Sequence, residues 1–278
     1  MLKDWWKLFR AEHALMVFIA ILLTELVVAG ELTTSSVLAA LGPVFVTLGA
    51  FAFNDYSGFK SDSALKRIDR PIVAGKISRK QALGASLILF ALGNALALLF
   101  APLIGFLIVV FFAVFSVLYD LYLKKLPLIG NVFVASTYSA SYFYGNIIVS
   151  NELNFFVIVF ITMAFFSGLG REFIITLRDV EGDKKTGAKT LPMILGSKKT
   201  ITLASMLIYL GVVASMLPLI KSFYLPYLVL IGLADAIWLG LTLLLFVKVT
   251  PLSLKKARNY SLYAMGFGLL ALASLVFA

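Results

Sequence analysis

Two short segments of this 278-residue chain carry carboxylates at spacings that suit a metal ion. The first, "NDYSGFKSD", starts at Asn54 and contains Asp55 and Asp62. The second, "DVEGD", contains Asp179 and Asp183, which are four residues apart and would share one face of a helix. Hard cations such as Mg²⁺ take oxygen ligands and typically use only one or two carboxylates beside substrate phosphates. The two segments therefore predict Mg²⁺ ligands around a diphosphate.

The first segment differs from the second at one position. When the two are aligned with a shift of 121 residues, Gly58 falls on Asp179, so the first segment lacks one carboxylate. Asp55 lies seven residues before Asp62 and falls on nearly the same helix face, and Asn54 borders that face with a carbonyl oxygen. We therefore predict an asymmetric site in which Asn54 and Asp55 carry more of the first metal.

The same shift aligns the residues that follow. Each segment continues with a Pro-x-x-x-Gly unit, at 71–75 and 192–196, and then with a basic cluster. We expect an internal repeat made of a loop at 54–81 and a loop at 171–199, with their acidic motifs opposed across a shared cavity. Parallel repeats of this kind occur in membrane proteins. Short loops that contain Pro and Gly also align by chance, so that alternative stays open.

The composition is that of an integral membrane protein. Hydrophobic residues make up 61% of the chain and charged residues 14%, against roughly 45–50% and 25% in soluble domains. The absence of cysteine excludes disulfides and thiolate metal sites, and the single histidine, His13, excludes a histidine-rich site. The net charge of +10 could indicate a nucleic-acid partner, but in a membrane protein it more often reports topology. We expect no nucleic-acid partner.

Hydropathy and charge predict how the chain crosses the membrane. The segments with the roughly 20 mostly apolar residues of a membrane span are 14–30, 36–54, 82–101, 103–119, 129–149, 153–171, 200–218, 226–247 and 260–278. Of the 24 basic residues, all but Lys221 lie on alternate connections, which the positive-inside rule places in the cytoplasm. We therefore predict a single all-α domain over 1–278. It would be a bundle of nine transmembrane helices around a central cavity, with a cytoplasmic N-terminus, two cytoplasmic Asp-rich loops and an outside C-terminus.

The cytoplasmic connections also carry cations that could bind a diphosphate. The candidates are Lys66, Arg67, Arg70, Lys124 and Lys189. Metal ions and basic side chains together would stabilise the charge that develops on a leaving diphosphate. The alternative is that these acids and bases pair with one another or with lipid headgroups.

Polar residues within the spans are the next candidates. Segment 129–149 is the most polar and contains Tyr138 and Tyr142, whose rings could stabilise an allylic cation. Ordinary packing through hydroxyl residues is the alternative. Glu25 and Asp235 are acids inside spans and thus functional candidates. For Glu25 we expect a solvated position near the outer end, and for Asp235 a protonated or hydrogen-bonded structural group.

These features resemble the UbiA-type intramembrane prenyltransferases. The first motif of that family is NDxxDxxxD, here "NDYSGFKSD" with Gly58 in place of the middle Asp, and the second motif matches in full as "DVEGD". "YDLYLKK" resembles the Tyr and Lys signature of the family and gives Tyr119 and Lys124. "DRPIVAGKIS" gives Arg70. The resemblance covers essentially the whole chain and implies nine helices and an Mg²⁺-bound isoprenoid diphosphate.

One branch of the family is most similar. "GREFIITLRDVEGDKKTGAKTLP" resembles the archaeal ether-lipid branch. This resemblance implies transfer of a geranylgeranyl group from its diphosphate to the glycerol hydroxyl of geranylgeranylglyceryl phosphate. An allylic cation would form inside the bundle, away from water, and a carboxylate or the released diphosphate would take the acceptor's proton. We expect Mg²⁺ as cofactor, an isoprenoid diphosphate and a lipid-like acceptor as substrates, the bilayer as surroundings, and no obligate protein partner.

The residues and the resemblance together give each site residue an expected role. The expected metal ligands are Asn54, Asp55, Asp62, Asp179 and Asp183. The expected catalytic residues are Asp62, Asp179, Asp183, Lys124 and Tyr119. The residues expected to bind the diphosphate are Arg67, Arg70, Lys124, Lys66, Lys189 and Asn54. Those expected to bind the acceptor are Arg171, Tyr138 and Tyr142.

Three other functions stay open at this point. Within the same fold, the acceptor could be aromatic, of the 4-hydroxybenzoate or naphthoate type used in quinone synthesis. A transporter would distribute acids through its spans, whereas only Glu25 and Asp235 lie there. A relative that binds an isoprenoid lipid without catalysis could have lost activity through Gly58.

Overall fold

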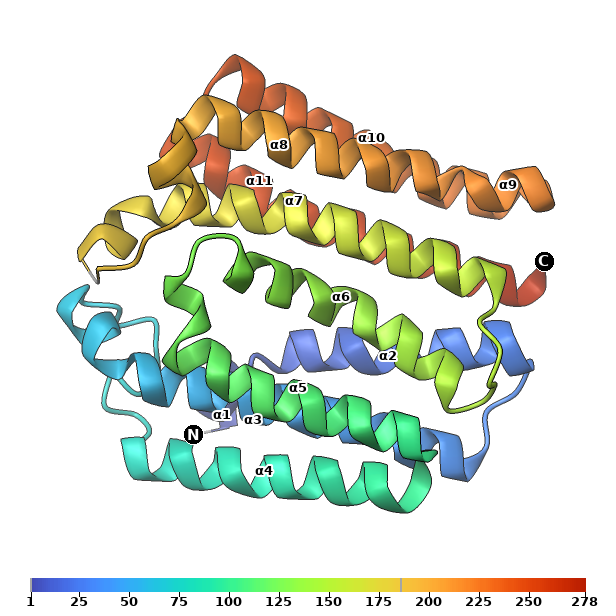
Figure 1. The fold of residues 1–278 in the computed structure, drawn as a ribbon, viewed down its shortest axis with the longest axis horizontal. Helices are drawn as coiled ribbons and strands as arrows, with labels where there is room; N and C mark the ends of the chain where they lie inside the picture. Colours follow the sequence, from blue (N-terminus) through green and yellow to red (C-terminus); the bar gives the residue numbers. More distant parts are fainter. Residues whose placement is uncertain (1, 186) are drawn as a thin grey trace. The chain divides into compact units, whose positions relative to one another are not determined.

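The computed structural model describes residues 2–185 and 187–278, and over these ranges it contains helices and no strand (Figure 1). The α-helices are α1 (Leu2–Phe9), α2 (Ala11–Ala29), α3 (Thr34–Ala64), α4 (Arg79–Phe100), α5 (Leu103–Leu121), α6 (Ile129–Ile147), α7 (Phe155–Lys185), α8 (Leu191–Ser215), α9 (Leu217–Lys221), α10 (Leu225–Val247) and α11 (Pro251–Ser274). Short 3₁₀ helices cover Leu123–Lys125 and Leu275–Phe277. The all-α prediction is confirmed.

Most of the predicted spans correspond to helices that could cross a membrane. Within the described residues, eight helices are long and apolar enough, namely α2, α3, α4, α5, α7, α8 with α9, α10 and α11. The predicted span 129–149 corresponds to α6, a helix of 19 residues rich in Ser, Thr and Tyr. Because of these hydroxyl groups, α6 is less apolar than the eight helices named above. The chain is a multi-pass membrane protein, and its nine-span count stays a prediction.

Several helices extend beyond the spans predicted from hydropathy. α3 continues to Ala64, past the predicted end at residue 54, and α7 continues to Lys185, past 171. Helical hydrogen bonds join backbone groups and do not require apolar side chains, so the end of an apolar run is not the end of a helix. The structure therefore places "NDYSGFKSD" and "DVEGD" on helices, where we had expected the loops 54–81 and 171–199 to begin.

The last helix shows the same effect at its start. α11 begins at Pro251 instead of residue 260. Thr250 and Ser253 form a capping box, in which each side chain accepts a hydrogen bond from the backbone of the other, and Pro251 occupies the first turn. Caps of this kind start a helix within a polar segment.

The chain is organised in two compact units. Unit 1 comprises residues 2–25, 31–123 and 144–152, and unit 2 comprises 26–30, 124–143 and 153–278. The division crosses α6 between Phe143 and Tyr144. That the whole chain acts as one polytopic domain stays a prediction.

In unit 1, α3 and α4 pack closely along their length (Figure 1). Glycines allow this contact, because a Cβ on Gly93 would lie 2.6 Å from the carbonyl oxygen of Gly42. The Ser86 hydroxyl also donates a 2.9 Å hydrogen bond to the Gly49 carbonyl. Nearer the acidic motif, a buried apolar cluster joins α1, α3, the loop after α3 and α4; its members are Leu8, Ala52, Ile72, Ile77 and Ala82. This cluster holds the loop that carries the site arginines against α3.

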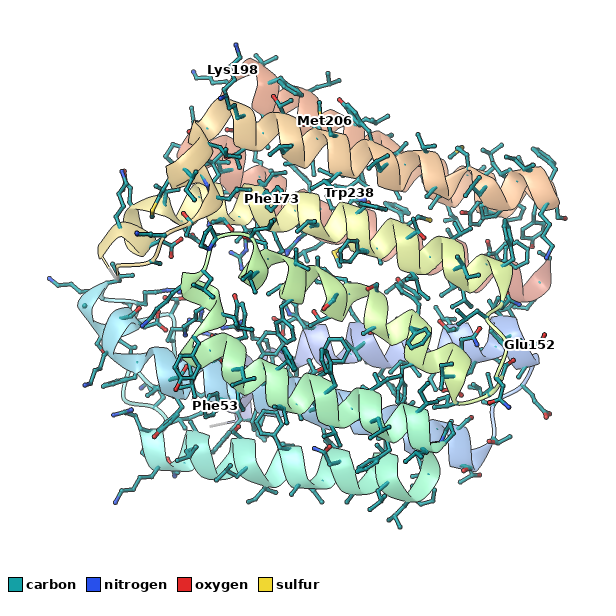
Figure 2. The ribbon with its side chains drawn as sticks, in the orientation of Figure 1. Phe53, Glu152, Phe173, Lys198, Met206 and Trp238 are labelled. Carbon is teal, nitrogen blue, oxygen red and sulfur yellow. The ribbon has the colours of Figure 1, made fainter. Side chains whose placement is uncertain are left out.

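In unit 2, α7 packs against α8, and α10 and α11 complete the core. Phe173 of α7 and Trp238 of α10 both belong to the buried cluster of this unit (Figure 2). Gly170 sits where α7 approaches α8 most closely, since a Cβ there would lie 2.6 Å from the Ala204 carbonyl oxygen. α7 is thereby fixed along its length and carries the second motif at its end.

The two units share features that the 121-residue shift aligns. α3 and α7 are both 31 residues long, and the shift carries residues 34–64 onto 155–185. It also carries Gly49 onto Gly170, each of which faces a carbonyl of the following helix. Gly75 and Gly196 both adopt a positive φ, 69° and 76°, which favours glycine. These correspondences support the internal repeat, which remains a proposal.

The close approach of α7 and α8 gives a testable prediction. Replacing Gly170 by Ala should lower the apparent melting temperature in detergent, because overpacking of a tight contact costs about 1–3 kcal/mol. Gly232→Ala is the matched control, since Gly232 has no atom near its Cβ position and Ala favours a helix. Equal melting temperatures for the two variants would contradict the prediction.

Candidate functional site

The first acidic motif centres on a buried carboxylate. Asp55 lies on α3, and its side chain is 1% exposed. Its Oδ1 accepts hydrogen bonds from Arg10 Nη2 at 3.2 Å and from Arg70 Nη1 at 2.8 Å. Its Oδ2 is buried and has no hydrogen-bond partner among the described residues. Two cations from different parts of unit 1 thus converge on one carboxylate.

Asn54 extends this network to a third helix. Its Oδ1 accepts a 3.2 Å hydrogen bond from Arg10 Nη2, and its Nδ2 donates to the carboxylate of Asp120 on α5. The network joins the α1–α2 junction, α3, α5 and the loop after α3. Sequence reasoning did not assign site roles to Arg10 and Asp120. Asp120 had a signal, as a charged residue at the end of the very apolar segment 103–119.

Asp62 lies near the end of α3 and is close to both predicted arginines, Arg67 and Arg70. Its Oδ1 is 3.4 Å from Arg67 Nη1, and its Oδ2 is 3.7 Å from Arg70 Nε. Arg67 also pairs with exposed Asp69 at 3.3 Å. Lys66 has a positive φ of 52° just after the helix, where the chain turns. The predicted first-motif residues and two of the predicted diphosphate-binding arginines therefore come together in unit 1.

The charge of Arg10 survives its burial. Burial and the nearby Arg70 guanidinium lower the pKa of Arg10 to about 10, while Asp55 and Asp120 act in the opposite direction. That pKa is well above neutral, so the guanidinium stays positively charged. The network consequently holds permanent cations beside the motif.

Position 58 has room for a side chain. A Cβ on Gly58 would meet only Asp62 Oδ2, at 3.6 Å, which is an ordinary contact. Gly58 lies within α3 and has no positive φ. Neither space nor backbone conformation therefore requires glycine where the family motif has Asp.

The second motif lies on the last turns of α7 in unit 2. Arg178 donates from Nε and Nη2 to the two carboxylate oxygens of Asp179, both at 2.7 Å. This pair is accessible, because the Asp179 side chain is 46% exposed. Asp183 follows one turn later, close enough for the two carboxylates to repel each other. A divalent cation between them would relieve that repulsion.

These residues fit Mg²⁺ when it is bound together with a substrate. The part of the chain that the structure describes has no group of three or more His, Cys, Asp or Glu side chains arranged to hold a metal ion. Asp179 and Asp183 supply two carboxylates, which matches the usual protein contribution to an Mg²⁺ site that includes phosphates and water. The two motifs belong to different units, so their juxtaposition stays a prediction.

The remaining predicted catalytic and diphosphate-binding residues lie in both units. Tyr119 is half-buried on α5 in unit 1, and Lys124 follows in the 3₁₀ helix of unit 2. The backbone N–H of Lys189 donates to the Lys125 carbonyl at 3.3 Å, which joins the segments that carry Lys124 and Lys189.

A second polar network lies in unit 2 around Arg171. Arg171, 5% exposed, donates from Nε to the Ser261 hydroxyl and from Nη1 to the Tyr138 hydroxyl, both at 2.9 Å. Glu172 accepts from Tyr138 at 3.0 Å and from Arg171 at 3.3 Å. Gly168 makes room for Tyr138, whose ring would lie 2.5 Å from a Cβ there. Of the predicted acceptor residues, the structure brings Arg171 and Tyr138 together.

Other predicted residues lie outside these networks. Tyr142 packs against Phe160, with ring centroids 5.7 Å apart. Glu25 is fully buried in unit 1, so the expectation of a solvated position was wrong. Asp235 accepts a 2.7 Å hydrogen bond from Ser215, which agrees with a structural group. Glu172 and Ser261 were missed, although "GREF" places an acid beside Arg171.

Comparison with known sequences gives consistent results. The UbiA prenyltransferase family matches residues 14–275. A digeranylgeranylglyceryl phosphate synthase from Archaeoglobus fulgidus is 32% identical, over 96% of this chain and 93% of its own. The enzyme of the same name from Thermococcus kodakarensis is 35% identical over 80% of this chain and 79% of its own.

The comparison with solved structures agrees with the comparison of sequences. A structure from work on digeranylgeranylglyceryl phosphate synthase in membranes is 28% identical, with a TM-score of 0.78, and covers 99% of this chain and 98% of its own. A UbiA homologue from Archaeoglobus fulgidus, bound to DMAPP and Mg²⁺, is 19% identical with a TM-score of 0.71. It covers 97% of this chain and 99% of its own, and at that identity it shows a shared fold.

Arg10 and Arg67 should differ in their effect on stability, because Arg10 pairs with the buried Asp55 and Arg67 with the partly exposed Asp62. Arg10→Met leaves a buried carboxylate with one partner fewer, which should cost about 2–5 kcal/mol. Arg67→Met removes a half-exposed pair and should cost about 1 kcal/mol or less. Thermal unfolding in one detergent compares the two variants. A larger loss of stability in Arg67→Met than in Arg10→Met would refute the assignment of Asp55 as a buried carboxylate that depends on Arg10.

Proposed function

Since the chain belongs to the UbiA prenyltransferase family, we propose that it moves a geranylgeranyl group from its diphosphate to the glycerol hydroxyl of geranylgeranylglyceryl phosphate. The observation that carries this proposal is the match to digeranylgeranylglyceryl phosphate synthases over nearly the whole chain. The match supports this acceptor over the aromatic acceptors of quinone synthesis.

The reaction exchanges one C–O bond for another. The bond between C1 of the geranylgeranyl group and the diphosphate breaks, and the glycerol oxygen forms an ether bond to C1. The hydroxyl proton passes to a carboxylate or to the released diphosphate. Both substrates are anionic amphiphiles, so the site needs cations for the phosphates and an apolar, water-free space for the chain.

The basic residues of both units would bind the donor diphosphate. Arg67 and Arg70 lie beside the first motif, and the segments of Lys124 and Lys189 meet in unit 2. Lys66 and Asn54 complete the proposed set. Asp179 and Asp183 would hold Mg²⁺, which when bound would neutralise charge that grows on the diphosphate as the C–O bond breaks.

The acceptor phosphate would bind at Arg171. The contacts with Ser261, Tyr138 and Glu172 use Nε and Nη1 and fix the plane of the guanidinium. A fixed guanidinium suits bidentate binding of a phosphate. Tyr142, on the same helix as Tyr138, would line the apolar part of the acceptor site, and Tyr119 would contact the donor near the diphosphate.

The topology proposed with this function has nine spans, with α6 as the ninth. Its polar face would then turn toward the substrates, because polar groups at membrane depth face a cavity or a partner helix. The distribution of basic residues supports a cytoplasmic location for both motifs and for the N-terminus. The isoprenoid chains would enter from the bilayer.

The second motif gives a direct test. Asp183→Ala should lower the transfer rate by about 10²–10³-fold, the usual effect of removing a group that stabilises developing charge. Glu181→Ala is the matched control, since Glu181 is exposed in the same motif. Radiolabelled product formed by purified protein in nanodiscs measures both. Full transfer activity in Asp183→Ala would contradict the assignment of Asp183 to the metal site.

The acceptor assay tests the function itself. Purified protein is given labelled geranylgeranyl diphosphate with geranylgeranylglyceryl phosphate or with 4-hydroxybenzoate, and only the first should be prenylated. Arg171→Met should raise the KM for the phosphate acceptor by roughly tenfold or more while the donor KM stays unchanged. Lys198→Met, on the exposed surface, is the control. Preferred prenylation of the aromatic acceptor would overturn the proposal.

A further inference from the structure

Most oxygens of the predicted first-motif ligands are engaged by arginines; the exception is Asp55 Oδ2. Asn54 Oδ1 and Asp55 Oδ1 accept from Arg10. Asp55 Oδ1 also accepts from Arg70, and both Asp62 oxygens lie within 4 Å of Arg67 or Arg70. A metal ion at Asn54 or Asp62 would have to displace guanidinium groups, whereas at Asp55 the buried Oδ2 has no hydrogen-bond partner among the described residues.

Burial makes metal binding costly at Asp55. The Asp55 side chain is 1% exposed, and Mg²⁺ usually keeps several water molecules, for which a buried carboxylate has no room. Separating a buried ion pair leaves uncompensated charge, which costs about 3–5 kcal/mol. The Arg178–Asp179 pair of the second motif is reached by water, so a metal can replace it at a lower cost than at Asp55.

The charge balance also differs from that of the complete family motif. Arg10, Arg67 and Arg70 face three buried or half-buried carboxylates, Asp55, Asp62 and Asp120. An acid at position 58 would add negative charge to this group and attract a cation. With Gly58 the group has one acid fewer than the family motif, so less negative charge opposes an anionic ligand.

The geometry points to a site with one metal ion. Resting on the proposed function, we propose that the first motif of this chain binds the donor diphosphate through arginines and that Mg²⁺ binds only at Asp179 and Asp183. Arg70 Nε supports this, because it is buried without a hydrogen-bond partner among the described residues and is a donor suited to a phosphate oxygen. Asp55 is then a positioning residue that orients Arg10 and Arg70, and Asp120 orients Asn54.

Counting bound metal tests the proposal without turnover. Mn²⁺ replaces Mg²⁺ in oxygen sites and is counted by the electron paramagnetic resonance of the free ion. The purified chain is titrated with Mn²⁺ in the presence of geranylgeranyl S-thiolodiphosphate, whose C–S bond resists cleavage. We expect one Mn²⁺ per chain for the wild type, two for Gly58→Asp, and fewer than one for Asp183→Ala.

Two results of the count would overturn the one-metal site. The first is two Mn²⁺ ions in the wild type, in which case the unpartnered Oδ2 of Asp55 is a ligand. The second is a single ion in Gly58→Asp, which would show that the acid at position 58 does not decide the count. Gly58→Asp is expected to fold, because its Cβ meets no close atom.

Asp55→Asn separates positioning from ligation. It should leave the Mn²⁺ count and affinity unchanged but weaken binding of the same analogue in EDTA by roughly tenfold or more. Asp69→Asn, which removes only an exposed partner of Arg67, should change neither measurement. A loss of Mn²⁺ affinity in Asp55→Asn, with metal-free binding intact, would identify Asp55 as a ligand and refute its positioning role.

The outcomes also separate this inference from the function on which it rests. A chain that binds no analogue, with or without metal, contradicts the proposed prenyl transfer. A chain that prenylates geranylgeranylglyceryl phosphate yet binds two Mn²⁺ ions contradicts the one-metal site alone.

Discussion

The buried carboxylate of Asp55 constrains unit 1, because it needs cations and they must come from distant parts of the chain. Arg10 comes from the junction of α1 and α2, and Arg70 from the loop after α3. Meeting this requirement fixes both segments on α3, and the apolar cluster that includes Leu8 and Ile72 holds them there. An uncompensated charge in that place would cost several kcal/mol, so the arginines are positioned before any substrate arrives.

α3 and α7 are equally long, and they carry different polar side chains at positions that the 121-residue shift aligns. The 121-residue shift places Thr176 at the position of Asp55 and Asp179 at the position of Gly58. In unit 2, half-buried Thr176 offers a neutral hydroxyl, which donates to the Glu172 carbonyl within α7. The other position holds Asp179, a carboxylate whose side chain is 46% exposed. In unit 1 the first position is the buried carboxylate of Asp55, and the second, Gly58, has no side chain.

Much of this could be predicted from the sequence, and the rest fails for identifiable reasons. Hydropathy located the helices because burial in lipid requires long apolar runs, but it could not locate the ends of α3 and α7, where backbone hydrogen bonding continues without apolar side chains. The motif spacing predicted Asp62 and Asp183 as site residues, and their roles stay predictions. It could not identify Arg10 or Asp120, because their partners are 44 or more residues away and only the fold brings them together. The difference in burial between Asp55 and Asp179 also cannot be predicted from the residues next to them in the sequence.

In the proposed one-metal site, the exposure of each carboxylate decides which ion it holds. A carboxylate that is closed off from water keeps the guanidinium that was buried with it, since neither can be hydrated while the other leaves. A carboxylate at a helix end exchanges a neighbouring arginine for a hydrated metal at little cost, because water screens the pair. Asp55 and Asp179 belong to these two classes. An acid at position 58 would lie beside Asp62 near the end of α3, where Asp62 already pairs with half-exposed Arg67. The first motif would then resemble the second motif, in which a partly exposed carboxylate can exchange its arginine for a metal ion.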